Sequence, residues 1–121
     1  MPPDTSIFRP ALLDGQVALV TGGGTGIGYG ITELLAALGA HVVVASRKPE
    51  HLEAAAERIR ADGGRVSTAQ LDVRDPERVR AVVDAVAAEH GRIDLLVNNA
   101  AGNFYAPSES LTPNAWRSVI E

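Results

Sequence analysis

The chain has 121 residues, 45% of them hydrophobic and 21% charged, as is typical of a single soluble globular domain. Its net charge of −4 argues against general nucleic-acid binding, because a phosphate backbone is bound through a basic surface. The lack of cysteine excludes disulfides and thiolate metal sites, and the three histidines lack metal-ligand spacing. Apolar runs are too short to cross a membrane, and residues 1–13 predict no signal peptide, so we expect a cytoplasmic protein.

Short apolar strands alternate with amphipathic helices along the chain. Apolar, often β-branched runs predict strands at residues 17–20, 41–45, 65–71 and 93–97. Helix starts are marked by Pro49, by Asp75-Pro76 and by Thr112-Pro113, whereas Gly39, Gly63-Gly64 and Gly91 mark helix ends.

Apolar residues at helical spacing follow each of the first three strands and mark one face of each helix, and we expect the third set to face inward. The first set is Ile27, Ile31, Leu34, Leu35 and Leu38, the second is Leu52, Ala55, Ala56 and Ile59, and the third is Val79, Val82, Val83, Val86 and Ala87.

This alternation implies parallel strands joined by right-handed crossovers. We therefore predict an α/β fold with three layers, α/β/α, built as the N-terminal half of a doubly wound parallel sheet with strand order 3-2-1-4. Residues 1–13 would form an N-terminal extension and residues 14–121 the domain. Such sheets bind ligands at the carboxyl ends of the strands where the order reverses, here between the first and fourth strands.

The stretch TGGGTGIG, residues 21–28, joins the first strand to the first helix. Glycine allows close backbone approach, and free amide groups at a helix start attract a pyrophosphate. The spacing differs from the strict G-x-G-x-x-G fingerprint, and a tight turn without a ligand is the alternative. The candidate cofactor-binding residues of this loop are Gly22, Gly23, Gly24, Thr25, Gly26, Ile27 and Gly28.

The second strand runs into ASRK, with Ser46 and Arg47 where cofactors with a free 2′-hydroxyl meet an acidic residue. A guanidinium there can clamp a 2′-phosphate, so we predict NADP(H) rather than NAD(H). The alternative is a solvated basic pair that opens the second helix.

The third strand ends in LDVRDP, residues 71–76. Asp72 is placed to accept a hydrogen bond from an adenine amino group, and Asp75 is interpreted as a helix cap. Arg74 lies between these two acids, and a surface ion pair is its alternative interpretation.

The motifs TGGGTGIG, LDV and NNAAG, in this order and spacing, resemble those of the short-chain dehydrogenase/reductases from about Leu13 to Glu121. Within that family VASRK, DVRDP, NNAAGNF and PNAW are similar to motifs of the 2,4-dienoyl-CoA reductases. The resemblance implies a Rossmann-like fold, NADP(H) as cofactor, an acyl-CoA substrate and a homotetrameric parent enzyme.

The resemblance also implies roles for individual residues. Asn98 would brace the fourth strand, and Ala100 and Gly102 would let the cofactor ribose approach. Asn103 would polarise the thioester of the substrate, because an amide N–H can stabilise negative charge on its oxygen. Contacts to the acyl-CoA are implied for Arg74, Phe104 and Thr112, although a threonine before proline is also an ordinary helix cap.

The family's proton donor, a tyrosine four residues before a lysine, is missing from these 121 residues. The one lysine, Lys48, has no tyrosine four residues before it, and Tyr29 and Tyr105 are each followed at that distance by glutamate. We therefore expect the NADPH-binding portion of a short-chain reductase, truncated before the Tyr-x-x-x-Lys segment and inactive alone. The alternatives are an enoyl-CoA or 3-oxoacyl reductase, or a dinucleotide-binding module without turnover.

Overall fold

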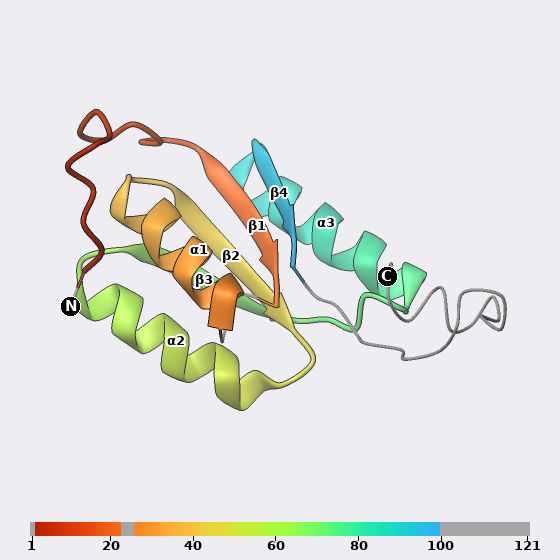
Figure 1. Ribbon diagram of the computed structural model, residues 1–121. Coiled ribbons are helices and arrows are strands. Elements are labelled where there is room, and N and C mark those ends of the chain that lie inside the picture. The colour runs from red at the N-terminus through yellow and green to blue at the C-terminus, as the bar shows by residue number, and fades with distance from the viewer. Residues whose placement is uncertain (1, 23–25, 100–121) are drawn as a thin grey trace, which may run out of the picture.

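The computed structural model describes residues 2–22 and 26–99 (Figure 1). Its elements follow the predicted alternation of strand and helix. In chain order they are β1 (Val17–Thr21), α1 (Gly26–Ala37), β2 (His41–Ser46), α2 (Pro49–Ala61), β3 (Arg65–Gln70), α3 (Pro76–His90) and β4 (Leu95–Asn98). The last predicted helix, beginning at Thr112-Pro113, lies outside the described residues.

The four strands form one parallel sheet in the order β3-β2-β1-β4, which confirms the predicted topology. The strand order reverses between β1 and β4, where Thr21 pairs in register with Asn98. Side chains on both faces of β1 are buried because helices cover the sheet on both sides. This double burial explains why the strand is a continuous apolar run without alternation.

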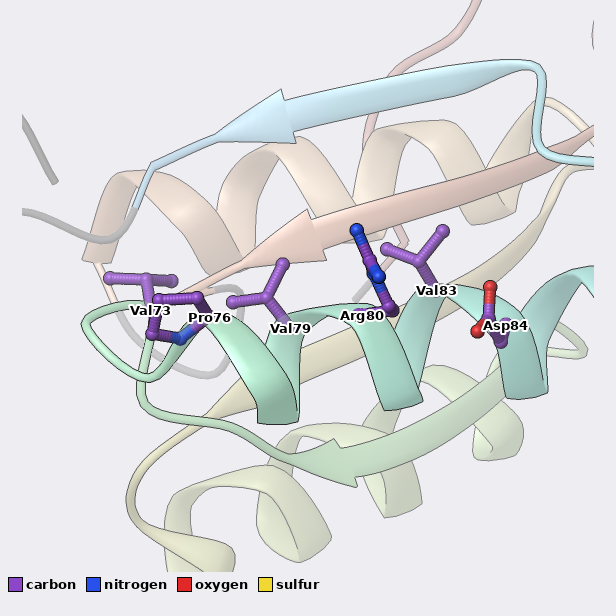
Figure 2. Close-up of a pocket in the computed structure, with 6 residues that line it drawn as sticks. All are labelled: Val73, Pro76, Val79, Arg80, Val83 and Asp84. Carbon is purple, nitrogen blue, oxygen red and sulfur yellow. The ribbon is translucent and has the colours of Figure 1, made fainter.

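Two hydrophobic clusters fill the spaces between the sheet and the helices on its two faces. Ala18 and Val20 of β1 pack with residues of α1 and α2, whereas Val17 and Leu19 pack with residues of α3. Figure 2 shows α3 in front of β1 and β4, with α1 behind them. The domain is therefore the predicted three-layer α/β/α arrangement, and each fully buried valine of the sheet contributes about 1.5–3 kcal/mol.

The start and end of α3 are those the sequence predicts. The Asp75 carboxylate accepts a hydrogen bond from the backbone N–H of Arg78 at 3.2 Å, and Pro76 is the first helical residue. Gly91 adopts a left-handed conformation with φ 75°, and its N–H donates to the carbonyl of Ala87. These caps fix where the chain leaves the carboxyl end of β3 and where it returns to begin β4.

The apolar residues at helical spacing in α1 do not all face the sheet. Ile27 is 79% exposed, whereas the buried residues of the helix are Gly28, Thr32 and Ala36. Small residues let α1 approach the sheet closely, so the helix turns this face inward. The hydroxyl of Thr32, fully buried, is satisfied because it donates to the carbonyl of Gly28 at 2.9 Å.

The predicted inward face of α3 is too wide. Val82 and Val86 are buried against the sheet, but Val83 is 37% exposed and Ala87 is exposed as well. Within the described part of the chain nothing packs over this second side of the helix closely enough to bury it. The apolar spacing of the sequence includes both sides of this helix face, whereas the sheet buries only the side that carries Val82 and Val86.

Candidate functional site

The sequence-predicted loops meet at the carboxyl edge of the sheet. β1 runs into the glycine loop, β2 into residues 46–48, β3 into residues 71–75 and β4 into the stretch that begins with Asn99. Parallel strands bring these four exits to one edge, and sheets of this kind bind ligands there, where the strand order reverses between β1 and β4. Among the described residues, the fold therefore brings Ser46, Arg47 and Asp72 to the same edge of the sheet as the ends of β1 and β4.

The glycine loop begins with a backbone conformation that suits glycine. Gly22 has φ 70°, and its N–H donates to the carbonyl of Ala45 on β2 at 2.7 Å. Gly26, with φ 57°, begins α1, so the positive end of that helix lies at the loop. The exposed side chain of Ile27 also lies at this helix start, while residues 23–25 (Gly23, Gly24 and Thr25) lie outside the described residues.

Asn99 ties β4 to the glycine loop, a role that sequence reasoning missed. Its side-chain amide donates to the carbonyl of Gly22 at 3.1 Å, and its backbone N–H donates to the hydroxyl of Thr21 at 3.1 Å. That hydroxyl in turn donates to the carbonyl of Val97 at 3.3 Å. The bracing role implied for Asn98 stays a prediction; Asn98 is an exposed strand residue paired in register with Thr21.

Gly28 completes this junction because a side chain would not fit. A β-carbon at this position would overlap the carbonyl oxygen of Gly22 and the side-chain nitrogen of Asn99. Its φ is not in the left-handed region, so space alone requires glycine here. The first turn of α1, Gly22 and the Asn99 side chain therefore pack closely together at this junction.

The end of β2 carries cationic and hydroxyl groups and no acid. The Ser46 hydroxyl accepts the backbone N–H of Lys48 at 3.3 Å, and the Arg47 side chain is exposed. The Ser46 carbonyl accepts the N–H of Leu71 at 2.9 Å, and the Arg47 carbonyl accepts the side-chain amide of Gln70 at 3.4 Å. Gln70, the last residue of β3, and Leu71 after it thus hold the backbone of Ser46 and Arg47.

Asp72 and Arg74 form an ion pair, as the alternative interpretation of Arg74 proposed. The Nη2 of Arg74 lies 2.9 Å from Oδ2 of Asp72, and Nε lies 3.1 Å from Oδ1. Hydrogen bonds from the Arg74 side chain and backbone lower the pKa of Asp72 to about 2. Asp72 is therefore a carboxylate at physiological pH, available as a hydrogen-bond acceptor at the carboxyl end of β3.

The remaining candidate residues lie outside the described residues. They are Ala100, Gly102, Asn103, Phe104 and Thr112. The described part also contains an open groove of about 540 Å³ along α3, drawn in Figure 2. Its lining comes from the exposed side of α3 and the turn before it: Val73, Pro76, Val79, Arg80, Val83 and Asp84. It shares no residue with the predicted cofactor site.

Two further observations concern the described residues only. No group of three His, Cys, Asp or Glu side chains there could hold a metal ion. None of α1, α2 and α3, the helices that the structure describes, is long and apolar enough to cross a membrane.

Curated relatives are similar along nearly the whole chain. A peroxisomal 2,4-dienoyl-CoA reductase of Danio rerio is 46% identical over 118 residues, which are 97% of this chain and 39% of the relative. A probable 2,4-dienoyl-CoA reductase of Bacillus subtilis is 39% identical over 109 residues, 90% of this chain and 43% of the relative. The chain thus spans about two fifths of the length of these relatives.

Solved structures share the fold. A citronellol catabolism dehydrogenase of Pseudomonas aeruginosa is 47% identical with a TM-score of 0.82, over 94% of this chain and 46% of its own. A metagenomic short-chain oxidoreductase in complex with NADP is 40% identical with a TM-score of 0.81, over 89% of this chain and 49% of its own. The family model of the short chain dehydrogenases matches residues 16–121. With this match over most of its length, the chain belongs to the short-chain dehydrogenase/reductase family.

Proposed function

We propose that the chain is the NADP(H)-binding portion of a reductase that transfers hydride to a conjugated acyl-CoA, as 2,4-dienoyl-CoA reductases do. The observation that carries this proposal is the convergence of three elements at one sheet edge. The glycine loop follows β1, Ser46 and Arg47 end β2, and Asp72 follows β3. A pyrophosphate, a 2′-phosphate and an adenine are recognised by groups of these three kinds.

The cofactor preference rests on charge. Arg47 presents an exposed guanidinium at the end of β2, next to Lys48, and no carboxylate stands between residues 44 and 48 to repel a phosphate. Arg47 would bind the 2′-phosphate of NADP(H), and the Ser46 hydroxyl would bind beside it. A family member of known structure binds NADP, which supports a nicotinamide dinucleotide here.

The substrate class rests on the relatives and on Asn103. Bound NADPH would supply hydride chemistry, and the oxygen of a conjugated thioester substrate would then need a hydrogen-bond donor for its developing negative charge. The Asn103 amide would donate a hydrogen bond to that oxygen, while Phe104 and Thr112 would contact the acyl-CoA. In this proposal the proton would come from an acid outside residues 1–121, and the chain alone would not turn over.

A second candidate is a dehydrogenase of citronellol breakdown, because a protein of that description is 47% identical to this chain. It would share the cofactor site and differ in the substrate that faces the nicotinamide. Two of the relatives are named as peroxisomal enzymes, so a cytoplasmic location of this chain stays a prediction.

A hybrid enzyme tests the proposed function. Residues 1–121 would replace the matching part of the Danio rerio reductase, whose remaining part would supply the general acid. We expect the hybrid to oxidise NADPH with a 2,4-dienoyl-CoA and not with citronellal, as followed by NADPH absorbance. Asn103→Ala should lower kcat by roughly 10²- to 10³-fold and leave the KM for NADPH nearly unchanged.

The unmodified relative and residues 1–121 alone are the controls for this experiment. A hybrid that folds and binds NADPH but reduces only citronellal would favour the second candidate. Turnover by residues 1–121 alone, free of contaminating reductase, would contradict the need for an external acid.

A further inference from the structure

Hydrogen bonds hold the turn between β3 and α3 at both of its ends. The N–H of Asp75 donates to the carbonyl of Asp72 at 3.0 Å, and the Asp75 side chain caps α3. The Nε of Arg78, in the first turn of α3, donates to the carbonyl of Gln70 at 3.0 Å. The last residue of β3 and the first turn of α3 are thus linked across the turn, and Asp72 lies between them.

Within this turn Arg74 donates three hydrogen bonds to the carboxylate of Asp72. Its backbone N–H and its Nε donate to Oδ1 at 2.9 and 3.1 Å, and its Nη2 donates to Oδ2 at 2.9 Å. A carboxylate has about four acceptor positions, so about one position on Oδ2 stays open. A carboxylate held in this way can accept a single N–H donor from a ligand and repels a ligand acceptor.

Stability does not explain this pair. The side chains of Arg74 and Asp72 are 60% and 36% exposed, and exposed ion pairs add little to the free energy of unfolding. The position of the pair in the fold instead indicates a role in ligand binding. The charge of Arg47 also lowers the pKa of Asp72, and Gln70 binds the Arg47 carbonyl, so Asp72 lies near the residue proposed to bind the 2′-phosphate.

We infer that Arg74 is a positioning residue that holds Asp72 in the orientation in which its carboxylate accepts a hydrogen bond from the adenine amino group. This inference rests on the proposed NADP(H) site and assigns Arg74 a task other than the acyl-CoA contact that the family resemblance implies. The pair would select a base with an amino group over a base with a carbonyl at the same ring position. Arg74 need not touch the cofactor to do so.

The test compares NADPH with its analogue in which hypoxanthine replaces adenine, so that a carbonyl replaces the amino group. We expect the unaltered chain to bind NADPH roughly tenfold or more tightly than the analogue, measured by NMR titration. Asp72→Ala should abolish this preference. Arg74→Leu should reduce it by roughly two- to tenfold, because Asp72 must then be ordered upon binding. If Arg74 only supported the local structure, its loss would lower the affinity for NADPH and for the analogue equally, and the ratio of the two affinities would not change.

Arg92→Leu is the matched control. Arg92 makes a similar pair with Asp94 two residues along, with Nη2 at 2.6 Å from Oδ1, but before β4 at the opposite edge of the sheet. This variant should keep the full preference. If Asp72→Ala lowers the preference and Arg74→Leu does not, the inference is wrong while the proposed site stands. If Asp72→Ala has no effect, or NADPH does not bind at all, the proposed site itself is wrong and the inference falls with it.

Discussion

Gly28→Ala is expected to destabilise the chain by about 2–4 kcal/mol, since overpacking and a lost hydrogen bond add together. The new methyl group would overlap the Gly22 carbonyl oxygen and the Asn99 side-chain nitrogen, and would lie 2.9 Å from the Gly22 carbonyl carbon. Relief requires α1, the loop or β4 to move, and the bond between Asn99 and Gly22 would then break. Urea unfolding followed by circular dichroism measures the loss.

Gly30→Ala provides the control in the same helix. Gly30 is exposed, and a β-carbon there meets no atom within 4 Å. This variant should stabilise the chain by about 0.5–1 kcal/mol, because alanine loses less backbone entropy in a helix. Equal stability of the two variants would show that the junction between the loop and β4 is not closely packed.

Self-association through β4 is the second large effect that we expect. In the described part of the chain β4 pairs only with β1, and Leu95 and Leu96 are 39% and 54% exposed. A strand with an unpaired edge and apolar side chains is a template for pairing with another copy. We predict marginal stability and concentration-dependent dimers or larger species at micromolar concentration.

Leu96→Lys should shift this equilibrium to the monomer, because a charge on an edge strand opposes pairing. Sedimentation velocity over a range of concentrations measures the shift. Ile7→Lys is the control, since Ile7 is 86% exposed but lies in the N-terminal segment far from β4 in the sequence. A monomeric unaltered chain that melts cooperatively well above about 50 °C would contradict the prediction.

Much of the fold could be predicted because its signals are local. Asp75 and Pro76 identify the start of α3, Gly91 identifies its end, and the valine-rich β2 identifies a buried strand. The right-handedness of the crossovers then reduces the possible strand orders to a few, of which 3-2-1-4 is the order of a doubly wound half-sheet. The inward face of α1 could not be predicted in the same way, because Gly28 and Thr32 face the sheet through their small size and not through hydrophobicity.

The site was predicted less completely for a physical reason. Asn98 and Asn99 are chemically identical neighbours, and only the twist and end of β4 determine which side chain turns toward Gly22. Likewise the sequence places Arg74 between Asp72 and Asp75, and either acid could pair with it. Asp75 is used as the helix cap, which leaves Asp72 for the guanidinium.

The central claim, an NADP(H) site at the carboxyl edge of the sheet, is tested most directly by titrating the chain with NADPH and with NADH. We predict that NADPH binds roughly tenfold or more tightly. Arg47→Ala should remove most of this difference, whereas Lys48→Ala, the change of a neighbouring exposed cation, should retain most of it. Arg47→Asp should move the preference toward NADH. Equal affinity of the unaltered chain for the two cofactors would contradict the assignment of Arg47 to the 2′-phosphate, and binding of neither would contradict the site.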